Sequence, residues 1–307
     1  MTTEPALSIQ GLTKSYGRVQ ALRGVDLEVG QGEVFGFLGP NGAGKTTTIR
    51  CLLDLIRPDS GTLRVLGMDP RADSIAVRRR VAYLPGELNL EANLSAEQAL
   101  RYLADLRGDD IDWNHVRELA RRLSLDLKTQ IKNMSKGNKQ KVGVVQAFMA
   151  PADLLLLDEP TSGLDPLMQQ EVYRLVREAQ AAGATVFFSS HIISEVQAIA
   201  QRVAIIRAGR IIRTLDPHEL IAMSTRRVRV RLREPLPEGA LAAVPGVTLI
   251  EGTFKEGTHK EGHGMELTIQ IEGEMDAFIK ALATFPVVDL ETERPSLEEI
   301  FLTLYEE

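Results

Sequence analysis

Residues 39–46 read GPNGAGKT and match the phosphate-loop pattern G-x-x-x-x-G-K-[ST]. An apolar run predicts a buried strand at 34–38 just before this loop, and a helix is predicted at 46–56 just after it. This strand–loop–helix context separates a phosphate loop from an ordinary glycine-rich turn. The candidate nucleotide contacts are Asn41, Gly42, Ala43, Gly44, Lys45, Thr46 and Thr47.

The residue types in this loop suit a triphosphate. Gly42 and Gly44 allow backbone N–H groups to turn toward the phosphates, and the N-terminus of the following helix adds the positive end of a dipole. Lys45 supplies a full charge, and Thr46 offers a hydroxyl group to Mg²⁺. We therefore expect Mg-ATP to bind here, with Lys45 taking part in catalysis.

A second pattern, LLLLDE at residues 154–159, predicts an apolar strand that ends in two acids. A strand buried on both faces delivers such carboxylates to the edge of the sheet where ligands bind. Asp158 would hold Mg²⁺, and Glu159 would polarise the attacking water. Capping of the next helix is the alternative role for these acids, and the nearby phosphate loop makes it the weaker one.

The segment MSKGNKQK at residues 134–141 stands just before this strand and resembles the signature of the ABC ATPase family, whose common form is LSGGQ. Ser135 and Gly137 keep the key positions, whereas Lys136 and Asn138 depart from the common form. The resemblance implies that Ser135 and Gly137 cap ATP bound to the opposite subunit. Outside this family, Ser135 would be interpreted as a plain helix cap.

Other elements of the family follow in the expected order, and the resemblance extends over residues 7–222. Residues 162–165 are similar to the D-loop, which faces the partner subunit. His191 corresponds to the switch histidine near the γ-phosphate, and Tyr16 to the aromatic residue that stacks on adenine. A structural role is the alternative for each of these two side chains.

One position departs from the family. A glutamine that ligates Mg²⁺ normally follows Tyr-Leu-Pro, and here Gly86 takes its place. Glu87 comes one residue later and offers the hard oxygen that Mg²⁺ prefers. Three alternatives stay open: Glu87 ligates the metal, water replaces the missing ligand, or Glu87 faces the membrane partner.

The elements that must position these residues alternate between strand-like and helix-like patterns. This alternation predicts an α/β fold with a mostly parallel sheet and helices on its faces. The family resemblance implies that this fold is the P-loop NTPase cassette. The helical segments between the two halves of the sheet are 95–123 and 135–149. Further strands are expected at 8–12, 25–29, 154–157, 185–188 and 203–206, and further helices at 167–181 and 192–200.

We expect two domains: an ATPase cassette at 1–222, with a helical subdomain at about 90–150, and a C-terminal accessory domain at 223–307. The second domain is predicted as a small α/β unit of ferredoxin-like order. Its strands are expected at 227–233, 247–251, 265–271 and 287–291, and its helices at 237–243, 274–284 and 296–305. Residues 295–305 resemble the end of subunits from the drug and antibiotic exporter (ABC-2 type) branch.

Charge and composition limit the choice of partner. The net charge is −6, and residues 223–307 carry 9 Lys or Arg against 16 Asp or Glu, which argues against nucleic acid as a partner. The arginines that alternate along 227–233 are most simply a solvated strand face. The single cysteine, Cys51, fits a reducing cytosol, and no apolar run approaches the roughly 18 residues that a membrane helix needs.

The resemblance implies an ATP-hydrolysing subunit of an ABC exporter, which works as a homodimer with a separate integral membrane permease on the cytoplasmic face of the cell membrane. A soluble ABC ATPase acting on ribosomes or DNA is the main alternative. Such proteins commonly carry two cassettes or long coiled coils, and this chain has neither. Lys45, Glu159 and His191 together argue against an inactive regulatory cassette.

Overall fold

The computed structural model describes residues 4–108, 110–217, 226–237, 239–241, 244–255, 264–271 and 275–293. The chain divides into two compact units, Met1–Pro217 and His218–Glu307. The predicted domain boundary between residues 222 and 223 lies outside the described ranges, as do the predicted helix at 296–305 and the exporter-like segment at 295–305.

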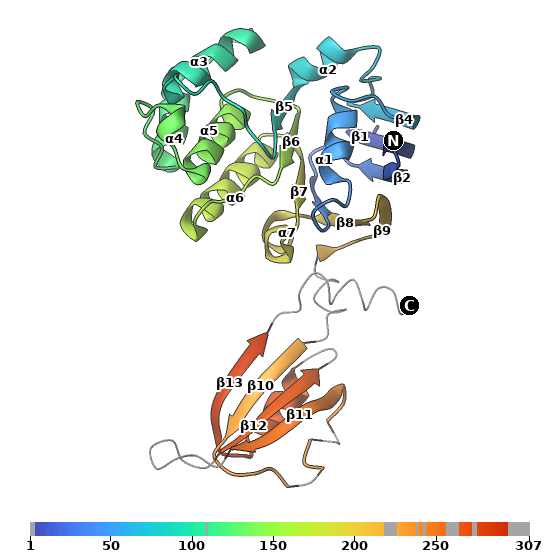
Figure 1. Cartoon of the computed structure of the whole chain (residues 1–307), viewed down its shortest axis with the longest axis vertical. Coiled ribbons are helices and arrows are strands. Elements are labelled where there is room, and N and C mark those ends of the chain that lie inside the picture. Colours follow the sequence, from blue (N-terminus) through green and yellow to red (C-terminus); the bar gives the residue numbers. More distant parts are fainter. Residues whose placement is uncertain are drawn as a thin grey trace. The chain divides into compact units, whose positions relative to one another are not determined.

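A six-stranded sheet runs through the first unit (Figure 1). Five strands are parallel, and the edge strand β9 pairs with β8 in the antiparallel sense. In spatial order the strands are β5 (Val81–Leu84), β6 (Leu154–Asp158), β7 (Thr185–Ser190), β3 (Val34–Leu38), β8 (Arg202–Arg207) and β9 (Arg210–Leu215). β3, β6 and β7 are buried along their whole length, which confirms the predicted mostly parallel, helix-covered sheet.

The first unit also contains an antiparallel sheet of three strands, in the order β2 (Val19–Val29), β1 (Leu7–Tyr16) and β4 (Ser60–Val65). The sequence predicts only the apolar parts of β1 and β2. The structure extends both, because their backbone pairing continues to the hairpin end, where Tyr16 faces Val19.

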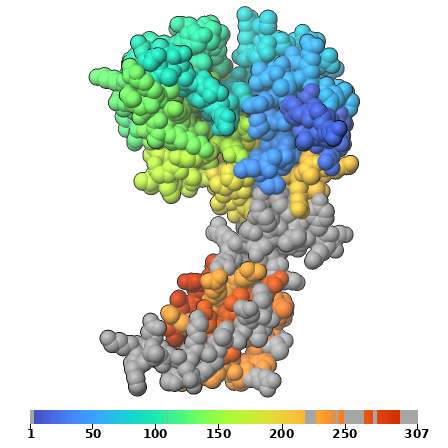
Figure 2. Space-filling view, viewed as in Figure 1, coloured from blue at the N-terminus to red at the C-terminus, as the bar shows by residue number. Residues whose placement is uncertain are grey.

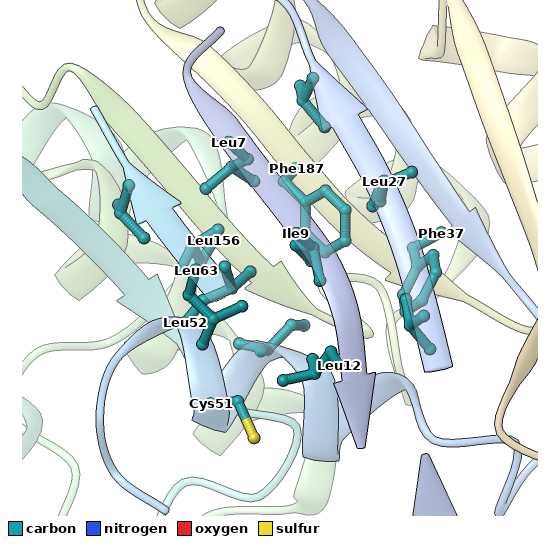
Figure 3. Packing of buried hydrophobic residues seen from close by; sticks show 14 of the residues in the cluster. Leu7, Ile9, Leu12, Leu27, Phe37, Cys51, Leu52, Leu63, Leu156 and Phe187 are labelled. Atoms are coloured by element: carbon teal, nitrogen blue, oxygen red, sulfur yellow. The ribbon is translucent and has the colours of Figure 1, made fainter. Parts of the chain in front are cut away.

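A large apolar cluster joins the two sheets through helix α1 (Lys45–Leu52), which contacts β6 of the large sheet and β2 and β4 of the small one. Figure 3 shows Leu7, Ile9 and Leu63 of the small sheet near Leu156 and Phe187 of the large one. The cluster fixes the start of α1 relative to the ends of the parallel strands.

Helix α1 ends at Leu52, and the prediction that it continues to residue 56 is wrong. Asp54 has a positive φ of 50°, a conformation that ends a right-handed helix. The remaining helices of the sheet region are α2 (Ser74–Arg80), α6 (Pro166–Ala181) and α7 (Ile193–Ile199). α6 begins where its sequence specifies, because Asp165 caps two N–H groups and Pro166 occupies the first turn.

The region predicted as a helical subdomain contains α3 (Ala96–Arg107), α4 (Trp113–Arg122), the short 3₁₀ helix η1 (Ile131–Asn133) and α5 (Lys136–Phe148). The helical stretch predicted at 95–123 contains two helices, with a break between Arg107 and Trp113 that the sequence prediction did not specify. Gly108 ends α3 with a φ of 76°, and Asp112 caps the start of α4. Figure 2 shows these helices, in green, as a lobe apart from the blue N-terminal residues.

The second unit contains a four-stranded antiparallel sheet in the order β11 (Val247–Lys255), β12 (Gly264–Ile271), β10 (Arg226–Leu232) and β13 (Val287–Glu293), with helix α9 (Asp276–Leu282). Numbered along the chain, the spatial order is 2-3-1-4, the order of a ferredoxin-like unit. The helix predicted at 237–243 is wrong for residues 239–241, which form turns; Gly239 has a φ of 77°.

The alternating arginines of β10 line one face of this sheet. Val228, Val230 and Leu232 are fully buried on the other face, in a cluster that includes Phe278 of α9. The cross-strand register places Arg229 opposite Glu291 and Arg231 opposite Asp289. The arginines therefore form an exposed face over an apolar one, as the sequence predicts. Their position opposite acidic residues of β13 was not predicted.

Candidate functional site

The loop between β3 and α1 has the geometry of a phosphate loop. Gly42 and Gly44 have φ values of 78° and 113°, which residues with a side chain rarely adopt. A Cβ atom on Gly44 would lie 2.7 Å from the Leu22 side chain and 2.9 Å from the Ala21 carbonyl oxygen. Gly44 is therefore required both by its backbone conformation and by the packing of β2 against the loop.

Lys45 begins helix α1 and is 5% exposed. Its Nζ donates to the carbonyl oxygens of Gly39 at 2.7 Å and Pro40 at 3.1 Å, and lies 3.6 Å from Glu159 Oε1. Burial lowers the pKa of Lys45, while the negative charges of Glu159 and Asp158 act in the opposite direction. The loop thus holds a buried amine at the start of a helix, where anions are favoured.

The carboxylate of Asp158 is completely buried at the end of β6. Its Oδ2 accepts a hydrogen bond from Thr46 Oγ1 at 2.7 Å, and its Oδ1 accepts one from Ser189 Oγ at 2.5 Å. Sequence reasoning missed Ser189. The neighbouring parallel strand brings it here, because the register of β6 and β7 pairs Asp158 with Ser189.

Glu159 follows β6 and faces two basic side chains. Its Oε1 lies 3.1 Å from His191 Nδ1 and 3.6 Å from Lys45 Nζ. Its backbone N–H donates to Ser189 Oγ at 3.1 Å, and its φ is 50°. A residue with a side chain pays a steric cost in this left-handed region, and such positions concentrate at functional sites. The structure therefore brings Lys45, Glu159 and His191 into one cluster.

Thr46 Oγ1 and the Asp158 carboxylate lie next to each other, and both are hard oxygen ligands of the kind that Mg²⁺ prefers. Among the described residues, no three His, Cys, Asp or Glu side chains converge as a metal site. Mg²⁺ in nucleotide sites commonly takes one or two protein ligands and completes its shell with phosphates and water. The pair Thr46 and Asp158 fits that pattern.

Gly86, at the position of the family's glutamine, lies beside this pair. A Cβ atom placed on Gly86 would be 3.2 Å from Asp158 Oδ2. Glu87 is exposed, and none of its described contacts involves Thr46 or Asp158. The role of Glu87 as a metal ligand stays a prediction.

The signature segment begins α5. Ser135 caps the helix by accepting a hydrogen bond from the Asn138 N–H at 3.2 Å. A Cβ atom on Gly137 would lie 2.5 Å from the carbonyl oxygen of Gly163, so residues 162–165 pack closely against the signature segment. Within this chain, the absence of a side chain at Gly137 allows the backbone of Gly163 to approach it closely.

Gln140, one turn further along α5, is a second residue that sequence reasoning missed. Its side-chain amide is buried and donates to the carbonyl oxygens of Glu159 and Pro160, both at 3.1 Å. The signature helix is thereby connected to the backbone of the Glu159 segment.

The other predicted contacts differ in their exposure. Tyr16 ends β1 and is 49% exposed, and the Lys14 ammonium group lies 5.7 Å from the centre of its ring. Asn41 is exposed, Thr47 is half-buried and Ala43 is buried within the loop. An exposed aromatic ring at a loop edge is available for stacking.

Comparison with known proteins identifies a family. The profile described as ABC transporter matches residues 22–162. The daunorubicin/doxorubicin resistance ATP-binding protein DrrA of Streptomyces peucetius is 34% identical over 322 residues, which cover 99% of this chain and 94% of that protein. The bacitracin transport ATP-binding protein BcrA of Bacillus licheniformis is 37% identical over 204 residues, or 66% of each chain.

A solved structure supports the same fold. The dimeric, post-hydrolysis ATP-binding cassette MJ0796, bound to ADP and Pi, has a TM-score of 0.62 and 21% identity, and covers 69% of this chain and 98% of that one. The likeness to that cassette is one of fold. No helix within the described ranges of this chain is long and apolar enough to cross a membrane.

Proposed function

Because the chain belongs to the ATP-binding subunits of ABC transporters, of the drug and antibiotic exporter type, and is an ATPase, we propose that two copies complete each other's ATP sites. Among the described residues, no hydrogen bond or ion pair joins the signature segment to the phosphate loop; the signature segment contacts residues 162–165 instead. Ser135 and Gly137 of one copy would therefore cap ATP held by Lys45 of the other.

The residue roles follow from the Lys45–Glu159–His191 cluster. The backbone N–H groups of the loop and Lys45 bind the phosphates, and Tyr16 stacks on adenine. Glu159 orients and deprotonates the attacking water, and His191 stabilises the charge that develops on the γ-phosphate. The observation that carries this proposal is that Glu159 Oε1 lies 3.1 Å from His191 Nδ1 and 3.6 Å from Lys45 Nζ.

Mg²⁺ would be held by Thr46 and Asp158, whose oxygens already lie 2.7 Å apart. When bound, the ion would neutralise charge on the phosphate oxygens. Ser189 keeps the Asp158 carboxylate in place through its hydrogen bond to Oδ1. Glu87 is the proposed third protein ligand, and contact with a membrane subunit is the competing role for its exposed side chain.

Variants at two adjacent positions separate these roles of Glu87. If it binds the metal, Glu87→Ala should raise the Mg²⁺ concentration needed for half-maximal hydrolysis, with little change in metal-free ATP binding. Glu87→Gln should be tolerated better. The matched variant Gly86→Gln restores the family's amide beside Asp158 and should rescue Glu87→Ala. An unchanged Mg²⁺ requirement in Glu87→Ala would reject the ligand role.

We also propose that the cassette pair works with a separate integral membrane permease on the cytoplasmic face of the cell membrane. The relatives named for transport and drug resistance support this partner. The acidic balance of residues 223–307 supports the exclusion of nucleic acid.

A complementation assay tests the shared sites. Lys45→Ala and Ser135→Arg should each be inactive, because each removes one half of every site. Mixed subunits contain heterodimers with one intact site, so the mixture should recover up to about a quarter of wild-type ATPase activity. Lys45→Ala mixed with Glu159→Gln is the control and should recover none, because both residues belong to the same half. Recovery in neither mixture would reject the shared-site proposal.

A further inference from the structure

The proposed mechanism does not use one buried carboxylate of the first unit, that of Glu195. Glu195 belongs to the first turn of α7 and is 4% exposed. Its Oε2 accepts a hydrogen bond from Ser190 Oγ at 2.5 Å, and its Oε1 accepts one from Thr161 Oγ1. Both hydroxyl groups are themselves buried.

The partners of Glu195 are unusual for a buried acid. Burying a carboxylate is costly unless it is paired or fully hydrogen-bonded. The described partners of Glu195 are two neutral hydroxyl groups, and none of its described contacts is an ion pair. By contrast Glu171, equally buried in the same unit, pairs with Arg122 and Arg174 at 2.5 and 2.6 Å.

The two hydroxyl groups belong to residues that lie close in sequence to Glu159 and His191. Thr161 stands two residues after Glu159 and begins the turn that continues as residues 162–165. Ser190 directly precedes His191, and its Oγ also accepts the Ile192 N–H at 2.9 Å. Since Glu159 and His191 contact each other at 3.1 Å, Glu195 closes a ring of bonds that holds both.

We propose that Glu195 is a positioning residue for hydrolysis: it holds Thr161 and Ser190 together and so sets the distance between Glu159 and His191. A shift of residues 162–165 would move Thr161 and, through Glu195, the His191 segment. The proposal rests on the proposed roles of Glu159 and His191. Among the described residues, no hydrogen bond or ion pair joins Glu195 to either of them; its carboxylate is bonded to Thr161 and Ser190 instead.

Glu195→Gln tests this proposal while preserving side-chain volume. One of the two accepting oxygens becomes an NH2 group, which can only donate, so one of the two hydroxyl groups must change from donor to acceptor and the ring loosens. We expect kcat to fall by about 10-fold, which is less than the roughly 10²-fold loss that a 1 Å misplacement can cause. The KM for ATP should change less than about twofold, because the phosphate loop is untouched. Thr161→Val, which replaces only the hydroxyl group with a methyl group, should give a similar fall in kcat. Glu171→Gln is the matched control for a buried glutamate and should leave kcat near wild type.

The decisive measurement repeats Glu195→Gln in a His191→Ala background, by single-turnover hydrolysis. If Glu195 acts through His191, the second substitution should slow hydrolysis less than about twofold there. An equal loss of kcat in both backgrounds would overturn the proposal, as would a raised KM with unchanged kcat. Wild-type turnover in His191→Ala alone would instead refute the proposed role of His191, a result distinguishable from any outcome at Glu195.

Discussion

In the six-stranded sheet, polar side chains gather where the parallel strands end, whereas in the four-stranded sheet they line one face along the strands. Asp158 and Ser189 at the ends of β6 and β7 are completely buried. Arg231 and Asp289 on β10 and β13 have side chains that are 60% and 51% exposed, and their closest charged atoms lie 3.5 Å apart.

The difference teaches where chemistry can occur in this chain. Buried polar groups interact strongly because little water screens them, and in the first sheet they converge on the start of α1. Exposed ion pairs contribute about 0–1 kcal/mol, so the charged face of the second sheet is a solvated surface. Substitutions at the two kinds of position should therefore differ in both size and kind of effect.

The largest effect is expected at Lys45. Lys45→Ala removes the buried positive charge of the phosphate loop and should abolish ATP binding measured by titration calorimetry. Lys128→Ala removes an exposed lysine and is the control. Tight ATP binding by Lys45→Ala would mean that residues 39–46 are not the phosphate site.

Gly137→Ala should destabilise the cassette by about 1–3 kcal/mol, the usual cost of overpacking. The new Cβ atom would lie 2.5 Å from the backbone oxygen of Gly163, and residues 162–165 would have to move. Urea unfolding of this variant should be compared with that of Lys136→Ala, at the neighbouring exposed position. Equal midpoints for the two variants would contradict the close packing described here.

Cys51 shows that a buried group of the first unit need not do chemistry. Burial raises the pKa of its thiol from 9.0 to about 11, so at pH 8 only about one molecule in a thousand carries the thiolate. Alkylation by iodoacetamide should be negligible in the folded protein and complete in urea. Because the folded-state pKa is raised, this group's contribution to stability is present below pH 9 and is lost as the pH rises toward 11. Rapid alkylation of the folded protein at pH 8 would contradict the burial of Cys51.

The smallest effect is expected at Arg231. Arg231→Ala removes one exposed ion pair and should change the free energy of unfolding by less than about 1 kcal/mol, with ATPase activity unchanged. Urea unfolding and steady-state hydrolysis measure both quantities. A loss of ATPase activity would show that the exposed face matters to the catalytic unit.

Strands and helix ends that have a strong local sequence pattern are predicted well. The strand at 34–38 appears with the predicted bounds. Helix α6 begins at Pro166 and is capped by Asp165, two residue types that are common at the start of a helix. Apolar runs are strong signals because parallel strands are buried on both faces. The division of the stretch 95–123 was missed, although Gly108 and Asp112 carry recognisable end signals.

Only some residues of the candidate site can be recognised from the sequence. Lys45, Asp158 and Glu159 stand in recognisable local patterns. Ser189 and Glu195 do not, because their contacts depend on the register of β6 against β7 and on the direction in which α7 begins. Serine and glutamate are common residue types, so the sequence alone gives no reason to select these two.

Glu159→Gln tests the central claim most directly, because it removes the proposed proton acceptor without changing the phosphate loop. Hydrolysis should be measured at saturating Mg-ATP, together with ATP binding by titration calorimetry. The account predicts that turnover falls by about 10²–10⁴-fold while ATP still binds with near wild-type affinity. Wild-type turnover with binding intact would contradict the account and show that Glu159 is not the catalytic carboxylate.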